Sequence, residues 1–197
     1  MDSNSLTIVG ASRPHPNETS NGDGWVVHRL GDIYRLTVID GLGHGPAAAA
    51  ATGAALARLE TAVTVDPAEV LRVCHDALSG TRGAVMLVAC INPSVGQLRF
   101  AGVGNVEARL RQNGDENRLV SYRGIVGVIL PTIRTFEFEL SPDWLLVVHT
   151  DGIASRFDLA AELDGEIVSA DWAQRFLERW ARLTDDATVV AVTERLT

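Results

Sequence analysis

The sequence contains no lysine, since all 17 of its basic residues are arginine. This absence excludes chemistry that needs a lysine amine, namely Schiff-base catalysis, the lysine of nucleotide-binding phosphate loops and the strand lysine of protein kinases. Cysteine is also scarce. Cys74 and Cys90 stand alone, with neither a C-x-x-C motif nor a disulfide framework. Isolated cysteines of this kind favour a reducing, cytoplasmic setting.

Long apolar runs and a targeting segment are absent as well. The longest apolar runs, Val85–Ile91 and Trp144–Val148, are far too short to cross a bilayer. The polar start, Met1–Ser5, has neither the basic nor the apolar region of a signal peptide. The net charge of −8 disfavours nucleic acid and anionic membrane surfaces as partners. We therefore expect a cytoplasmic protein with no nucleic-acid or membrane partner.

What the sequence does contain is typical of a globular protein. Of its 197 residues, 46% are hydrophobic and 21% are charged. A chain of this length buries about 70% of its unfolded surface and needs no disulfide or metal simply to fold. There is no low-complexity linker, internal repeat or charge block. We expect a single domain over residues 1–197.

Apolar runs separated by glycine, proline and asparagine predict the secondary structure. The expected strands are Leu6–Ala11, Trp25–Leu30, Tyr34–Ile39, Val85–Ile91, Gln97–Ala101, Val106–Arg111, Arg134–Leu140, Trp144–Thr150 and Ala187–Val192. The expected helices are Pro46–Ala62, Pro67–Leu78 and Ala170–Leu183, the last with Trp172, Phe176, Leu177, Trp180 and Leu183 on one face. Strands in consecutive runs, rather than in alternation with helices, predict an α+β fold of two packed sheets flanked by helices.

Aspartates recur where apolar strands begin or end. Asp40 and Asp151 each follow a strand and precede a glycine, Asp185 and Asp186 directly precede the last strand, and Asp23 precedes Trp25. Turn chemistry explains any one of these positions, because Asp-Gly is a common turn pair. Together they could converge on one end of a two-sheet sandwich. Converging carboxylates repel one another unless a cation neutralises them, and oxygen ligands suit Mg²⁺ or Mn²⁺.

The order of several short motifs gives a family resemblance. The segments are Asp40-Gly41-Leu42-Gly43-His44-Gly45, Thr81-Arg82-Gly83, Gly102-Val103-Gly104-Asn105, His149-Thr150-Asp151-Gly152 and Asp185-Asp186-Ala187-Thr188. In this order the chain resembles the metal-dependent serine/threonine protein phosphatases of the type 2C (PPM) superfamily, in their sporulation stage II E branch. The Thr-Arg-Gly and Gly-Val-Gly-Asn segments look most like phosphatases that reset the stressosome of the general stress response. The resemblance implies an αββα four-layer sandwich with mainly antiparallel sheets and a two-metal site at one end.

The resemblance also implies roles for individual residues. Asp40 would bridge two Mn²⁺ or Mg²⁺ ions, and the Gly41 carbonyl would bind one of them. Asp151 and Asp185 would hold the second ion, and Asp186 is the neighbouring candidate ligand. Asp23 matches the early acidic position, which acts through a water ligand of the metal.

His44 departs from the family pattern. The eukaryotic branch carries a histidine directly after Asp-Gly as a proposed general acid, whereas this chain has Leu42 there. His44, two residues further on, could protonate the leaving oxygen, or it could serve only to start the helix. Arg13 and Arg82 could each bind substrate phosphate or remain solvated.

The expected function is removal of phosphate from serine or threonine by a water that two metal ions activate, without a covalent intermediate. By resemblance, the substrates would be phosphorylated STAS-domain proteins of a stressosome or partner-switching module. Two alternatives stay open: a non-catalytic scaffold of the same fold that binds such a partner, and a phosphatase of small molecules.

Overall fold

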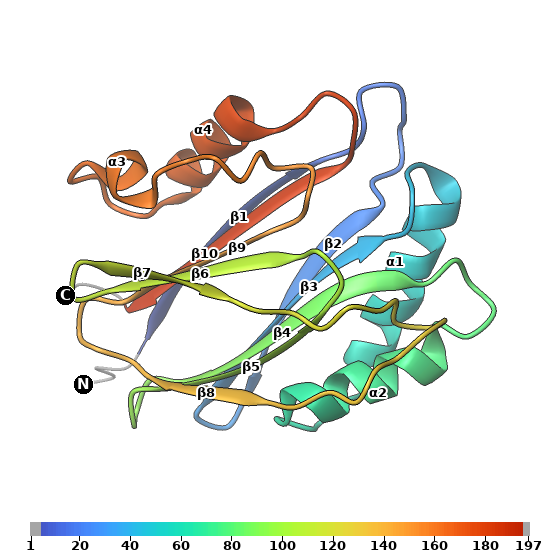
Figure 1. The fold of residues 1–197 in the computed structure, drawn as a ribbon, viewed down its shortest axis with the longest axis horizontal. Coiled ribbons are helices and arrows are strands. Elements are labelled where there is room, and N and C mark those ends of the chain that lie inside the picture. Colours follow the sequence, from blue (N-terminus) through green and yellow to red (C-terminus); the bar gives the residue numbers. More distant parts are fainter. Residues whose placement is uncertain (1–4, 195–197) are drawn as a thin grey trace.

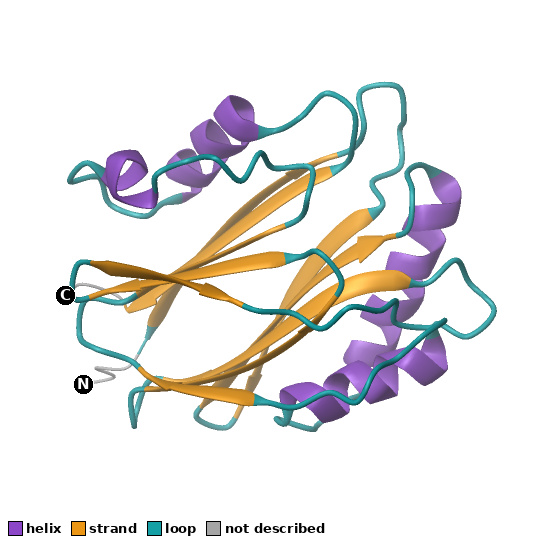
Figure 2. Ribbon diagram, in the orientation of Figure 1, coloured by secondary structure: helices purple, strands orange, loops and turns teal. Residues whose placement is uncertain are grey.

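The computed structural model describes residues 5–194 and consists of two five-stranded sheets packed face to face, with helices on both outer faces (Figures 1 and 2). The first sheet has the order β1 (Leu6–Arg13), β10 (Ala187–Glu194), β9 (Leu145–His149), β6 (Glu107–Gln112) and β7 (Asp115–Leu119). The second has the order β2 (Asp23–Leu30), β3 (Ile33–Gly41), β4 (Ala84–Asn92), β5 (Gln97–Val103) and β8 (Phe136–Glu139). All neighbouring strands are antiparallel. The expected α+β sandwich is confirmed.

The helices form the two outer layers. The second sheet is covered by α1 (Pro46–Leu59) and α2 (Pro67–Ala77), and the first sheet by α3 (Leu159–Leu163) and α4 (Ala170–Trp180) (Figure 1). No helix within residues 5–194 combines the length and the apolarity needed to cross a membrane.

Burial on both faces explains the continuous apolar runs in the sequence. In β4, Val85 and Leu87 point into the core between the sheets, whereas Met86 and Val88 point toward α1 and α2. Side chains alternate between the two faces of a strand, so a strand in an inner layer must be apolar at nearly every position. Strands β9 and β10 follow the same rule, with their outer faces against α4.

The first and last strands pair along their full length. Residues Leu6 and Glu194 are partners at one end of the β1–β10 ladder, and Arg13 and Ala187 are partners at the other. Ala187 directly follows the Asp185–Asp186 pair, so this second end is the one that carries the aspartates.

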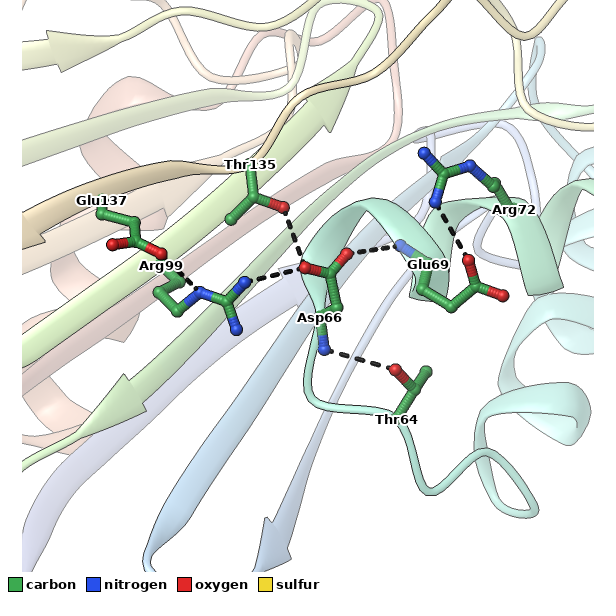
Figure 3. Close-up of polar contacts among 7 residues, drawn as sticks. All are labelled: Thr64, Asp66, Glu69, Arg72, Arg99, Thr135 and Glu137. Carbon is green, nitrogen blue, oxygen red and sulfur yellow. Dashed lines mark hydrogen bonds and ion pairs between the residues drawn. The ribbon is translucent and has the colours of Figure 1, made fainter.

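A polar network fixes the start of α2 to the second sheet (Figure 3). Asp66 is the N-cap of the helix, and its carboxylate accepts a 2.9 Å hydrogen bond from the Glu69 N–H. The same carboxylate accepts a 2.8 Å hydrogen bond from Arg99 on β5, which also contacts Glu137 on β8 at 3.0 Å. Asp66 thus caps α2 and joins it to β5, and Arg99 extends the network to β8.

The structure corrects two helix ends. The helix expected over Pro46–Ala62 ends at Leu59, where the buried Arg35 guanidinium takes up the Leu59 and Ala62 carbonyls. The helix expected over Ala170–Leu183 ends at Trp180, because the Arg182 N–H donates to the Gly152 carbonyl at 2.7 Å. Leu183 is therefore not on the helical face, and 77% of it is exposed.

Two elements were not expected from the sequence. The short helix α3 begins at an N-cap aspartate, Asp158. Strand β7 carries only one buried residue, Leu119, so it lacks the apolar alternation that marks a strand. It forms a hairpin with β6 through Asn113-Gly114, both of which have positive φ.

Candidate metal and active site

Two of the predicted site residues are neighbours on the second sheet. Asp23 begins β2 and Asp40 lies near the end of β3, and the antiparallel register makes them direct partners. The Gly41 N–H donates to the Gly22 carbonyl at 3.0 Å and continues this pairing. Two carboxylates thus face the same end of the sandwich.

The first sheet brings the remaining aspartates to the same end. Asp151 follows β9, and Asp185 and Asp186 precede β10, whose antiparallel pairing with β9 places these segments together. A hydrogen bond of 2.7 Å from the Thr150 hydroxyl to the Asp23 carboxylate joins the two sheets. The predicted convergence therefore occurs.

These segments enclose an open cavity of about 270 Å³. Three of the aspartates line it, together with residues of the glycine-rich loop, β4 and two further loops; the lining consists of Asp40, Leu42, Gly43, Val85, Asn105, Ile125, Asp151 and Asp185. The Asn105 amide donates to the Asp151 carboxylate at 2.6 Å and orients it.

Burial and mutual repulsion raise the pKa of the carboxyl groups. The pKa of Asp40 is raised to about 9, first by burial and then by the negative charges of the four neighbouring aspartates, Asp23, Asp151, Asp185 and Asp186. Because so many negative groups meet here, Asp40 holds a proton at neutral pH when no cation is bound.

The pKa of Asp23 is raised less, to about 7. Burial is the main cause of the rise. Hydrogen bonds from Thr150 and Thr188 favour the charged form of Asp23 and therefore lower its pKa, against the effect of burial. The pKa of Asp151 is raised by burial and then by Asp185. The charge of Arg182 opposes the rise at Asp151 without cancelling it, so positive charge balances the carboxylates only in part.

The donor set fits a hard divalent cation. Within residues 5–194, no three histidine, cysteine, aspartate or glutamate side chains are gathered tightly enough to form a ready-made metal cage. The aspartates instead line an open cavity, and the buried Oδ2 of Asp186 has no hydrogen-bond partner. Oxygen donors without thiolate or imidazole, in a site short of positive charge, suit Mg²⁺ or Mn²⁺.

Asp185 and Asp186 have different surroundings. Asp185 lines the cavity and accepts a 3.0 Å hydrogen bond from the Asp186 N–H. Asp186 is buried, and its Oδ1 accepts a 2.8 Å hydrogen bond from the His15 N–H. The geometry thus favours Asp185 as the residue that faces a bound ion, with Asp186 anchoring the loop that contains His15.

Glycine is required at position 41. A Cβ there would lie 2.4 Å from the Ala48 carbonyl oxygen, so only glycine permits this close approach of α1 to β3. The packing fixes the position of the Gly41 backbone beside Asp40, where its carbonyl is the predicted ligand.

His44 lies outside the residues that line the cavity. Its ring stacks on His15, with centroids 4.5 Å apart, and its Nδ1 is 3.0 Å from a carboxylate oxygen of Glu18. These contacts clamp the loop between β1 and β2 onto the start of α1. These contacts agree with a structural role for His44 at the start of α1. Protonation of a leaving group by His44 stays a prediction.

Two polar residues near the cavity were not predicted as site residues: Asn105 contacts Asp151, and Thr150 contacts Asp23. Arg82, a candidate phosphate ligand from the sequence, lies beside Gly43. Arg13 instead donates to the backbone carbonyls of Pro14, Asp185 and Arg182. Arg13 therefore supports the Asp185 loop and is not free for phosphate.

The four-layer α+β sandwich, with its aspartates at one end, defines the class of metal-dependent PPM phosphatases. A family model described as Stage II sporulation protein E (SpoIIE) matches residues 31–195, and the chain belongs to this family of PPM phosphatases. No curated protein matches the chain by sequence.

Solved structures share the fold over nearly the whole chain. One, from work on the bacterial stressosome as a modular system adapted to control secondary messenger signalling, is 27% identical and covers 95% of this chain and 99% of its own, with a TM-score of 0.89. RsbX in complex with magnesium is 21% identical over 95% of this chain and 94% of its own, with a TM-score of 0.83. The phosphatase domain of SpoIIE from Bacillus subtilis is 18% identical over 98% of this chain and 65% of its own, with a TM-score of 0.79.

Proposed function

We propose that this chain is a single-domain, RsbX-like phosphatase that removes phosphate from serine or threonine residues of STAS-domain proteins and so resets stress signalling. The observation that carries the proposal is the convergence of Asp40, Asp151 and Asp185 from both sheets on one open cavity. Membership of the SpoIIE family supports the reaction class. Similarity to RsbX and to the stressosome protein supports the substrate class and a cytoplasmic setting.

The aspartates would hold two divalent ions. We assign Asp40 and the Gly41 carbonyl, with Asp151 and Asp185, as the ligands, and place Asp23 and Asp186 in the surrounding shell of acceptors. When bound, Mg²⁺ or Mn²⁺ supplies the Lewis acidity that activates a water for attack on phosphorus. PPM phosphatases use these two ions, and the related RsbX structure contains magnesium.

The chain's own residues prepare this site. The Thr150 hydroxyl holds one Asp23 oxygen, and the Asn105 amide holds one Asp151 oxygen, so both carboxylates are oriented before substrate arrives. Pre-oriented groups need no reorganisation during the reaction, which favours the transition state. His44, positioned by Glu18, is our proposed source of the proton for the leaving oxygen.

The surface beside the cavity supports a protein substrate. Val128 and Ile129 are 52% and 66% exposed, and both donate backbone hydrogen bonds to Ile125, which lines the cavity. Apolar side chains at the rim could contact a folded partner around its phosphorylated residue.

Hydrolysis of an aryl phosphate tests the reaction. We expect turnover in Mn²⁺ or Mg²⁺, none in excess chelator, and a loss of about 1,000-fold or more for Asp40→Asn, which removes a charge and a ligand oxygen. The control is Asp32→Asn, in the β2–β3 turn at the far end of the sheet.

The alternatives give other results. A scaffold would bind a phosphorylated STAS protein without hydrolysing it, and a small-molecule phosphatase would cleave free phosphoserine as fast as the protein. Full turnover by Asp40→Asn, or in chelator, would reject the metal site itself.

A further inference from the structure

Arg82 lies at the rim of the carboxylate cavity. One terminal nitrogen of its guanidinium is 3.1 Å from the position that a Cβ on Gly43 would occupy. Gly43 itself lines the cavity together with Asp40 and Asp185. The arginine therefore reaches over the glycine-rich loop from a separate segment, the turn between α2 and β4.

The backbone that carries Arg82 is held on both sides. The Thr81 hydroxyl donates to the Leu78 carbonyl at 2.7 Å and accepts from the Gly83 N–H at 3.0 Å. The Gly83 carbonyl accepts from the Leu42 N–H at 3.1 Å, which joins the turn to the glycine-rich loop. Gly83 has a φ of +81°, and a Cβ there would lie 2.6 Å from Ile125. Only the Arg82 side chain is thus free to adjust.

The Arg82 guanidinium has no partner in the described part of the chain, where it makes neither a hydrogen bond nor an ion pair, and it is exposed. Of the other arginines near the site, Arg13 donates to backbone carbonyls. Arg182 is exposed, and its charge acts on the Asp151 carboxylate. Arg82 is therefore a cation with open donors beside an acidic cavity.

We propose that Arg82 binds the phosphate group of the substrate at the rim of the Asp40 cavity. The planar guanidinium presents parallel N–H donors that match two oxygens of a phosphate monoester, so it can bind them as a bidentate pair. This inference rests on the proposed function and adds the residue that selects the phosphate dianion. It also fits the glycine at position 43, where a Cβ would crowd the Arg82 guanidinium at 3.1 Å.

Three variants test the proposal. Arg82→Gln removes the charge, and Arg82→Lys keeps the charge without the planar fork. The control Arg29→Gln removes another exposed arginine, at the opposite end of β2 from Asp23. Two quantities are measured in excess Mg²⁺: kcat/KM for p-nitrophenyl phosphate, and the affinity for inorganic phosphate, from phosphorus NMR titration and product inhibition.

Arg82→Gln is expected to weaken phosphate binding and lower kcat/KM by about tenfold or more, the usual effect of losing a charged hydrogen bond. Arg82→Lys should fall between it and wild type, and Arg29→Gln should match wild type. The Mg²⁺ concentration for half-maximal activity should not change, because Arg82 is not a metal ligand.

Phosphate affinity that is unchanged in Arg82→Gln, equally reduced in Arg29→Gln, or undetectable in wild type would overturn the proposal. A wild-type protein that binds phosphate through Arg82 but hydrolyses no phosphate ester would instead reject the proposed function alone. The binding measurement therefore separates the two failures.

Discussion

At the scale of single residues, Asp40 and Asp23 couple metal binding to protonation. With no cation bound, Asp40 has a pKa of about 9 and Asp23 of about 7, so at pH 7 the folded protein holds protons that ordinary aspartates would have lost. A metal ligand must be deprotonated. Binding of Mg²⁺ or Mn²⁺ at pH 7 should therefore release about one proton or more, and fewer above pH 9.

Calorimetric titration in buffers of different ionisation enthalpy measures this release. Asp40→Asn should lower it and Asp32→Asn should not. The same pKa shifts determine how the stability of the metal-free protein depends on pH. The raised pKa values add stability to the metal-free fold below about pH 4, and this contribution is lost as pH rises toward 9. A proton release of zero at pH 7 would contradict the raised pKa values.

The sequence located the aspartates but not the residues that orient them. Asp40 and Asp151 could be found because each directly follows an apolar strand, a local signal. Thr150 contacts Asp23 from 127 residues away, and Asn105 contacts Asp151 from 46 residues away. Such contacts depend on how the two sheets pack, which no local pattern encodes.

At the scale of secondary-structure elements, Asp66 links α2 to the second sheet (Figure 3). We expect Asp66→Ala to lower the free energy of unfolding by about 1–2 kcal/mol, mostly through the lost N-cap, because the partly exposed ion pair with Arg99 is screened. Glu69→Gln breaks an exposed ion pair with Arg72 and should cost less than about 0.5 kcal/mol. Urea unfolding curves of the two variants measure the difference, and equal losses would show that the cap is unimportant.

Some boundaries of helices and strands could be predicted from neighbouring residues alone, and others could not. Pro46 and Asp66 mark the starts of α1 and α2 correctly, because capping is a property of neighbouring residues. The end of α4 could not be predicted, because Arg182 leaves the helical path to pair with Gly152 on another segment. Strand β7 has a local turn signal at Asn113-Gly114 but no apolar face, since it lies at the edge of its sheet.

At the scale of the whole molecule, the open cavity and the exposed residues beside it predict how substrates are chosen. The cavity of about 270 Å³ holds little more than a phosphorylated side chain, so further affinity must come from surface contacts such as those of Val128 and Ile129. We expect kcat/KM to be about tenfold or more higher for an intact phosphorylated STAS domain than for the matching phosphopeptide, because remote contacts add to transition-state binding. Steady-state kinetics on both substrates check this, and equal values would reject recognition of a folded partner.

The pairing of β1 with β10 has a practical consequence for labelling. Leu6 and Glu194 are partners at the end of the ladder away from Arg13 and Ala187, which lie next to the aspartates. Seven residues of strand separate the two ends, or about 23 Å at 3.3 Å per residue. A fluorescent protein or an affinity tag joined beside Leu6 or Glu194 would therefore lie on the side of the molecule remote from the cavity and leave its mouth open to a large substrate.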